Sequence, residues 1–265
     1  MKLIKGIVYS NVWIALGSAV YVSHTFFATG SPINYPLLWM VFFATLFSYN
    51  FQRLVRFDII ENKTSDRLIW MKRNKKVLQT ITVFSFISAA TLALFHLSVT
   101  EMLLTLPALV LVVFYASFFN QNKKGLRDLP FIKIFIISAV WAYVLGVFPL
   151  LLSGNTLNWD LVFIDKFCFI LAITIPFDIR DLVFDAKEKK TIPMMFGIKG
   201  AKLIAIVALA FSFYLNSWYA TNLIVLGCFY GTVLLLILLS NKKKSELYYS
   251  GLIDGLLIFS PLLFL

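Results

Sequence analysis

Charged residues are scarce in this chain of 265 amino acids: only 14% are Asp, Glu, Lys or Arg, whereas 60% are hydrophobic. The mean hydropathy of +0.85 is far above that of a soluble domain, which needs a polar surface. The apolar and polar alternation of membrane β-barrel strands is also missing. These absences exclude a soluble globular domain. They indicate an all-α, polytopic membrane protein, because membrane-spanning helices satisfy their own backbone hydrogen bonds.

Acidic residues are scarcer still, since 13 Asp and Glu stand against 24 Lys and Arg, a formal charge of +11. Such a surplus can indicate a nucleic-acid partner. Here, however, the Lys and Arg residues are concentrated in short loops between apolar runs, as membrane topology and contact with anionic lipids require. We therefore expect membrane lipids as partners and no nucleic acid.

Cysteine is nearly absent. The two cysteines, Cys168 and Cys228, lie inside apolar runs and form neither a metal-binding pattern nor a disulfide framework. We interpret them as packing residues. The first apolar run is too long for the hydrophobic region of a secretory signal, and no small-residue cleavage site follows it. We expect it to be the first membrane span.

Apolar runs of spanning length recur along the whole chain, and a helix needs about 20 such residues to cross a bilayer. They predict a helical bundle of about nine transmembrane helices, at 7–28, 35–57, 76–95, 100–119, 131–152, 159–182, 201–219, 222–240 and 247–265. No Pro/Gly/Ser-rich linker or soluble insertion separates them. Residues 1–265 are therefore expected to form a single transmembrane helical domain.

The loops between these runs alternate in charge. Residues 29–34 and 96–99 carry no Lys or Arg, whereas every even-numbered run is followed by a basic loop. By the positive-inside rule, the N-terminus is expected in the cytoplasm and the C-terminus outside, in an integral membrane protein such as one of a bacterial inner membrane. The most charged loop, 58–75, is expected to carry a short interfacial helix that includes Ile69, Trp70 and Met71.

An acidic cluster lies where the sixth expected span ends. Asp178, Asp181 and Asp185 recur at i, i+3 and i+7, so a helix places them on one face, within about 60° of each other. Carboxylates without His or Cys suit Mg²⁺, which proteins usually hold by one or two carboxylates together with substrate phosphates. The nearby bases Arg180 and Lys187 suit an anionic phosphate. The alternative is a solvated helix end whose acids pair with these bases.

The segment DIRDLVFDAKEKKTIPMMFG resembles the second aspartate-rich motif of the UbiA superfamily of intramembrane prenyltransferases. Thr191, Pro193 and Gly197 stand where that motif continues with Thr, Pro and Gly. The resemblance implies a bundle of nine helices. It also implies that the aspartates bind Mg²⁺, which holds the diphosphate of an isoprenoid donor.

The first motif of that family, approximately N-D-x-x-D-x-x-x-D at the end of helix two, is incomplete here. In SYNFQRLVRFDII, Asn50 and Asp58 match its first and last positions, whereas Phe51 and Leu54 replace the two intervening acids. The resemblance implies that Asn50 and Asp58 join the acids of the second motif in binding Mg²⁺. The resemblance also makes Asn50, Asp178, Asp181 and Asp185 the candidate catalytic residues.

Arg53 and Arg56 occupy the same helix end. One guanidinium group can donate two parallel hydrogen bonds to phosphate oxygens, so these arginines could take over part of the metal's role. The alternative is that both arginines only set the topology and that Asn50 forms hydrogen bonds between helices.

Further candidates for substrate binding lie near the same expected end of the bundle. Lys133 and Arg127 resemble basic residues that help to hold the diphosphate in the family, and membrane anchoring is their alternative role. Tyr115, with Tyr49 and Trp141, could stabilise an allylic carbocation by cation–π attraction. Asp254, an isolated acid in the ninth span, is either functional or a packing group of the outer half.

We therefore expect Mg²⁺-dependent ionisation of a polyprenyl diphosphate and transfer of the prenyl group to an unidentified lipid or aromatic acceptor. One alternative is a terpene cyclase of the same fold, which needs no acceptor. The other is a non-catalytic family member or a transporter. A transporter favours internal repeats, and the sequence gives no convincing one.

Overall fold

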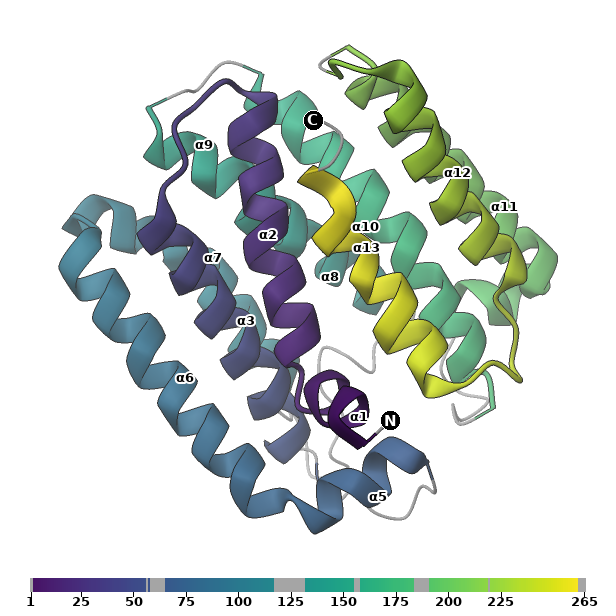
Figure 1. Cartoon of the computed structure of the whole chain (residues 1–265), viewed down its shortest axis with the longest axis horizontal. Helices are drawn as coiled ribbons and strands as arrows, with labels where there is room; N and C mark the ends of the chain where they lie inside the picture. Colours follow the sequence, from purple (N-terminus) through teal and green to yellow (C-terminus); the bar gives the residue numbers. More distant parts are fainter. Residues whose placement is uncertain are drawn as a thin grey trace.

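The computed structural model describes residues 2–55, 57, 65–116, 132–154, 158–183, 191–218 and 220–261. In these ranges the chain forms helices joined by short connections, without strands (Figure 1). The first half contains α1 (Lys2–Tyr9), α2 (Val12–Ala28), α3 (Tyr35–Val55), α5 (Asp66–Arg73), α6 (Lys75–His96) and α7 (Val99–Ala116). The second half contains α8 (Ile132–Ala142), the π-helical turn η2 (Tyr143–Val147), α9 (Phe148–Leu152), α10 (Trp159–Asp181), α11 (Ile192–Asn216), α12 (Leu223–Leu239), the π-helical turn η3 (Tyr248–Ile253) and α13 (Asp254–Phe259). The expected all-α fold is confirmed.

Each of the nine expected runs coincides with one of these helices or with consecutive helices. Three helical stretches, Lys75–His96, Ile132–Leu152 and Ile192–Asn216, are long and apolar enough to cross a membrane, and a fourth is added if α1 and α2 form one broken span. The count of about nine spans is approximate. The predicted short helix in the basic loop is present as α5, where Ser65 Oγ accepts a hydrogen bond from the Leu68 amide at 3.3 Å and so caps its start.

Two of the expected runs differ from the helices in the structure. The run 7–28 is not one straight helix, because α1 and α2 meet at an angle of 63°. Asn11 at the break adopts a left-handed conformation with φ of 66°, which Asn tolerates better than most residues. The seventh helix begins at Ile192 rather than at residue 201, and it bends at Gly197.

The long helices pack as a bundle with roughly aligned axes (Figure 1). The second helix, α2, lies between α3 and α13, whereas α10 contacts α8 and α11 (Figure 1). A Cβ atom at Gly17 in α2 would lie 3.1 Å from Leu257 Cβ and 3.4 Å from the Asp254 carbonyl oxygen of α13. The missing side chain therefore lets the two helices approach closely, as small residues do in membrane proteins.

Replacing Gly17 by Val should destabilise the bundle by about 1–3 kcal/mol, because the added atoms overlap α13. Gly227→Val in α12 is the matched control, since a Cβ atom there meets no atom within 4 Å. The difference in stability is measured in detergent as the fraction of each variant that stays monodisperse at increasing temperature. Equal stability of the two variants would contradict this view of the α2–α13 contact.

Large apolar side chains cover the outside of the bundle. Phe84 on α6 is 59% exposed, Leu203 on α11 is 63% exposed and Ile224 on α12 is 78% exposed. Patches of this kind mark contact with lipid or with other apolar surfaces. The surface therefore fits an integral membrane protein.

The two ends of the bundle differ. One end, called here the aspartate end, is where α3 ends at Val55 and α10 ends at Asp181, and α1 and α5 lie there as well (Figure 1). The opposite end holds the end of α2 and the start of α10.

Candidate functional site

The acids of the second motif lie one helical turn apart at the aspartate end. Asp178 is only 2% exposed, and its Oδ1 accepts a hydrogen bond from Lys133 Nζ at 2.8 Å. The same Nζ lies 3.9 Å from Asp181 Oδ2. The structure thus brings these three predicted residues together, with α8 beside α10. The buried carboxylate has a charged partner, without which its burial would cost several kcal/mol.

Arg180 extends this group toward Glu246, which lies two residues before η3. Its Nε donates to Asp181 Oδ1 at 2.9 Å, and its Nη1 donates to Glu246 Oε1 at 3.2 Å. The guanidinium carbon also lies 5.1 Å from the ring centre of Phe177 and 5.4 Å from that of Tyr249. Arg180 is therefore fixed by two carboxylates and two aromatic faces.

Among the described cationic side chains at this end, that of Arg67 in α5 is the most buried, with 9% of the residue surface exposed. Its Nη2 donates to Asn11 Oδ1 at 2.6 Å, and its Nη1 donates to Ser250 Oγ at 2.9 Å and Glu246 Oε1 at 3.4 Å. Burial lowers the pKa of the Arg67 guanidinium, and the Glu246 carboxylate acts in the opposite direction. Its Nε is buried and has no hydrogen-bond partner among the described residues.

Glu246 consequently sits between two arginines. Its Oε1 accepts from both Arg67 and Arg180. One carboxylate oxygen thus contacts two guanidinium groups, so a single negative charge lies between two positive charges.

Asn50 joins helices at this end. Its Oδ1 accepts from Asn11 Nδ2 at 2.7 Å, and its Nδ2 donates to the carbonyl oxygens of Ser10 and Leu46, each at 3.0 Å. This is the hydrogen bonding between helices that the sequence left open as an alternative. A metal-binding role for Asn50 stays a prediction.

Arg53 lies one turn beyond Asn50 in α3 and is partly buried. Its Nη1 lies 3.9 Å from Met71 Sδ, a weak acceptor. Asp254 of α13 interacts electrostatically with Arg53, Arg67 and Arg180. This acid therefore belongs to the aspartate end, and the outer-half position considered from the sequence was wrong. The physical reason is that Asp254 follows the start of the last helical stretch by only about two turns, and this stretch starts at the aspartate end.

Aromatic side chains adjoin these charges. The rings of Tyr49 and Trp141 meet edge to face, with centroids 6.2 Å apart. Tyr115 at the end of α7 is 6% exposed and interacts electrostatically with Tyr49. The structure therefore brings the three predicted aromatic residues to the same part of the bundle.

Five predicted site residues, Arg56, Asp58, Arg127, Asp185 and Lys187, lie outside the described residues. Within the described ranges, no group of three or more His, Cys, Asp or Glu side chains could hold a metal ion. Mg²⁺, however, usually binds only one or two carboxylates of a protein, and substrate phosphates supply other ligands. Asp178 and Asp181 provide that number of carboxylates.

Sequence reasoning missed Arg67, Glu246, Asn11 and Ser250 as members of this site. A signal was present for Arg67, because it lies four residues before the apolar Met71 and so shares its helix face. Glu246 and Ser250 gave no comparable signal, since their contacts depend on how η3 docks against α5 and α10.

One end of the apolar helical bundle thus combines Asp178 and Asp181 with four cationic side chains, those of Arg53, Arg67, Lys133 and Arg180. The fold and the site define a helical membrane protein with a partly buried cluster of cations and acids at one end of its bundle. The profile of the UbiA prenyltransferase family matches residues 55–249, and the chain belongs to this family.

Solved structures with the same fold cover nearly the whole chain. A UbiA homolog from Archaeoglobus fulgidus bound to GPP and Mg²⁺ is 16% identical with a TM-score of 0.64, and the match covers 97% of this chain and 98% of that one. The apo structure of a UbiA homolog from Aeropyrum pernix K1 is 12% identical with a TM-score of 0.65, over 98% and 95% of the two chains. A structure described as digeranylgeranylglyceryl phosphate synthase is 16% identical with a TM-score of 0.56, over 98% of both chains. Comparison with curated proteins gives no match.

Proposed function

We propose that this protein is a prenyltransferase that ionises a polyprenyl diphosphate at the aspartate end and transfers the prenyl group to a hydrophobic acceptor. The observation that carries the proposal is the convergence of Asp178 and Asp181 with Lys133 and the arginines in one partly buried site. The family and the GPP- and Mg²⁺-bound relative support it.

The cationic residues would bind the diphosphate. Arg67 and Arg180 already share one carboxylate oxygen of Glu246, so their N–H groups converge on a common acceptor position. Arg53 has only the weak Met71 acceptor among its described contacts. A diphosphate that replaced Glu246 would receive charge-assisted hydrogen bonds from these guanidinium groups, which suits the loss of acids from the first motif.

Asp178 and Asp181 would hold Mg²⁺, to which Asp185 and Asp58 are also proposed as ligands. Bound Mg²⁺ supplies positive charge that stabilises a departing diphosphate. Lys133, which contacts both described acids, would keep them oriented and would add its own charge to the leaving group.

The allylic C–O bond would break with its electron pair going to the diphosphate. The resulting carbocation would lie against the faces of Tyr49, Trp141 and Tyr115, whose π electrons stabilise positive charge in a dry site. A nucleophilic atom of the acceptor would then form the new bond and lose a proton. The apolar bundle would keep water from capturing the carbocation first.

We also propose that the aspartate end faces the cytoplasm of a bacterial inner membrane. The elements at this end include α1, which carries Lys2 and Lys5, α5, which carries Arg73, and the connection after α12, which carries Lys242 (Figure 1). This asymmetry supports the orientation by the positive-inside rule, with the N-terminus inside and the C-terminus outside.

The test is an assay of purified protein in lipid nanodiscs with C10 to C20 prenyl diphosphates and Mg²⁺. Diphosphate release and lipid products are measured with and without membrane extract. Release that requires Mg²⁺ and extract, with a prenylated lipid as product, is expected. Release without extract, with a hydrocarbon or an alcohol as product, would contradict transfer and indicate that the protein is a terpene cyclase. No release from any donor would contradict catalysis.

Replacing Glu246 by Gln should lower the KM for the donor by about 3- to 10-fold and leave kcat near that of the unmodified protein. The substitution removes the charge that competes with the diphosphate for Arg67 and Arg180, so a larger fraction of the protein is ready to bind. Initial rates at varied donor concentration measure the effect. Glu101→Gln at the start of α7 is the control, because the hydrogen bonds of Glu101 to described residues are with Ser98. A higher KM for Glu246→Gln would show that Glu246 instead supports donor binding.

A further inference from the structure

A second buried polar cluster lies at the end of the bundle opposite the aspartates. Asp165 and Lys166 belong to α10, 13 residues before Asp178, which corresponds to about 20 Å along a helix. Asp165 is 7% exposed and Lys166 is 2% exposed. Ionisable groups buried in a membrane helix are rare and usually functional. The prenyl diphosphate site does not use this pair.

The carboxylate of this pair is fully engaged. Asp165 Oδ2 lies 2.9 Å from Lys166 Nζ, and Asp165 Oδ1 accepts from Ser212 Oγ at 2.6 Å and Asn216 Nδ2 at 2.5 Å. An ammonium group has three N–H donors, and Asp165 takes up one of those of Lys166. Among the described residues, Lys166 makes no second ion pair or hydrogen bond. The ammonium also lies 5.0 Å from the ring centre of Tyr21.

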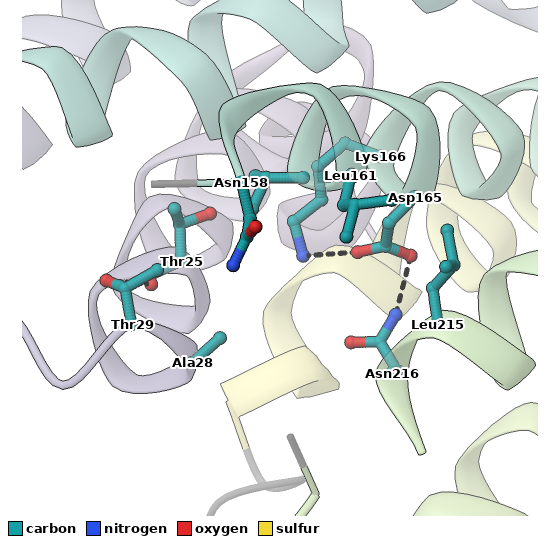
Figure 2. Close-up of a pocket in the computed structure, with 10 residues that line it drawn as sticks. Thr25, Ala28, Thr29, Asn158, Leu161, Asp165, Lys166, Leu215 and Asn216 are labelled. Carbon is teal, nitrogen blue, oxygen red and sulfur yellow. Dashed lines mark hydrogen bonds and ion pairs between the residues drawn. The ribbon is translucent and has the colours of Figure 1, made fainter. Parts of the chain in front are cut away.

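A cavity of about 240 Å³ opens beside this pair. Figure 2 shows the Lys166 ammonium and the Asn216 amide nitrogen directed at the Asp165 carboxylate, with Asn158 and Thr29 on the side of Lys166 away from Asp165. Leu161 and Leu215 give the cavity an apolar wall. Since a water molecule takes about 30 Å³ in the liquid, the cavity has room for a ligand group much larger than one water molecule.

The neighbouring helix holds Lys166 in place. A Cβ atom at Gly146 in η2 would lie 3.1 Å from Lys166 Cγ and 3.0 Å from Val162 Cγ1. Thr25 Oγ1 donates to the Leu145 carbonyl oxygen of the same turn at 2.6 Å. The π-helical turn therefore packs directly on the Lys166 stem, and such turns occur frequently at functional sites.

Exposed tryptophans mark the depth of the cavity. Trp159 at the start of α10 is 51% exposed, and Trp218 just beyond α11 is 70% exposed. Both helices line the cavity at these ends through Leu161 and Leu215. Tryptophan is enriched at membrane–water interfaces, so the cavity lies near the level of lipid headgroups.

We propose that this cavity is a second ligand site, which binds the uncharged, oxygen-bearing headgroup of a membrane amphiphile such as a long-chain alcohol. The ion pair leaves no net charge for an anion to balance, because Asp165 already neutralises Lys166. The free N–H groups of Lys166 and the amide of Asn158 can donate to a hydroxyl oxygen, and the apolar wall suits the attached chain.

The experiment uses decanol carrying a photoreactive diazirine, with the matched decanoate and decylamine probes, on the protein in nanodiscs. After irradiation, mass spectrometry locates the labelled peptides. Saturable labelling of the segments around 158–166 and 212–218 by the alcohol is expected, about tenfold above that by either charged probe. Stronger labelling by the carboxylate or the amine, or no saturable labelling there, would overturn the proposal.

Two variants test the residues themselves. Asn158→Leu removes a donor outside the ion pair, and the double change Asp165→Asn with Lys166→Met removes the pair without leaving an unpaired charge. Each should weaken labelling by the alcohol about tenfold, whereas Lys202→Met, on the exposed face of α11, should not. Unchanged labelling in Asn158→Leu would overturn the proposal even if the double variant does not fold. None of these readings depends on prenyl transfer at the other end.

Discussion

Replacing Asp178 by Asn should lower the rate of diphosphate release by about 10²- to 10³-fold. The amide keeps the size of the side chain but removes the negative charge that faces Lys133 and that would hold Mg²⁺. The loss should fall mainly on kcat, because the charge acts most strongly as the diphosphate departs. Single-turnover release of diphosphate from a saturating donor measures it.

Asp160→Asn is the matched control, since Asp160 is an exposed acid in the first turn of the same helix. It should keep the activity of the unmodified protein. Thermal stability of both variants separates a fold defect from a catalytic one, because Lys133 loses its nearest carboxylate in Asp178→Asn. Activity of Asp178→Asn within tenfold of the unmodified protein would remove this carboxylate from the catalytic site.

The group of Asp178, Asp181 and Lys133 could be predicted from the sequence for two physical reasons. Helical periodicity puts residues at i and i+3 on one face, and the alternation of spans brings the start of the fifth helix and the end of the sixth to the same end of the bundle. Neither step requires knowledge of how side chains pack. The structure then shows the ion pair at 2.8 Å.

The positions of Arg67 and Asp254 could not be predicted in the same way. Arg67 is buried only because α5 docks against the break at Asn11, and the sequence gives no rule for the left-handed turn there. Asp254 was left as either a functional acid or a packing group of the outer half, although the run 247–265 begins only about two helical turns before it, directly after a basic loop. The pair Asp165 and Lys166 lies within the run 159–182, but its contacts with Ser212 and Asn216 depend on how α10 packs against α11.

The large effect expected for Arg67→Met has two parts with different origins. The free energy of unfolding should fall by about 2–4 kcal/mol, because Asn11 and Ser250 lose a buried charged partner and Glu246 keeps only Arg180. The KM for the donor should rise by about 10- to 100-fold, because the diphosphate loses a guanidinium partner. Arg73→Met, which removes an exposed arginine of the same helix, should change neither quantity appreciably.

The double variant Arg67→Met with Glu246→Gln separates the two parts. It removes the excess negative charge left near Arg180, so about half of the lost stability should return, as thermal unfolding in detergent would measure. The KM should remain high, because a neutral glutamine cannot replace the guanidinium group as a phosphate ligand. If the KM recovered together with stability, Arg67 would only maintain the fold, and diphosphate binding would fall to Arg53, Arg180 and Lys133. A high KM in a stable double variant would instead place Arg67 in direct contact with the donor. Its guanidinium group would then replace part of the positive charge that Mg²⁺ bound by the missing acids of the first motif would supply.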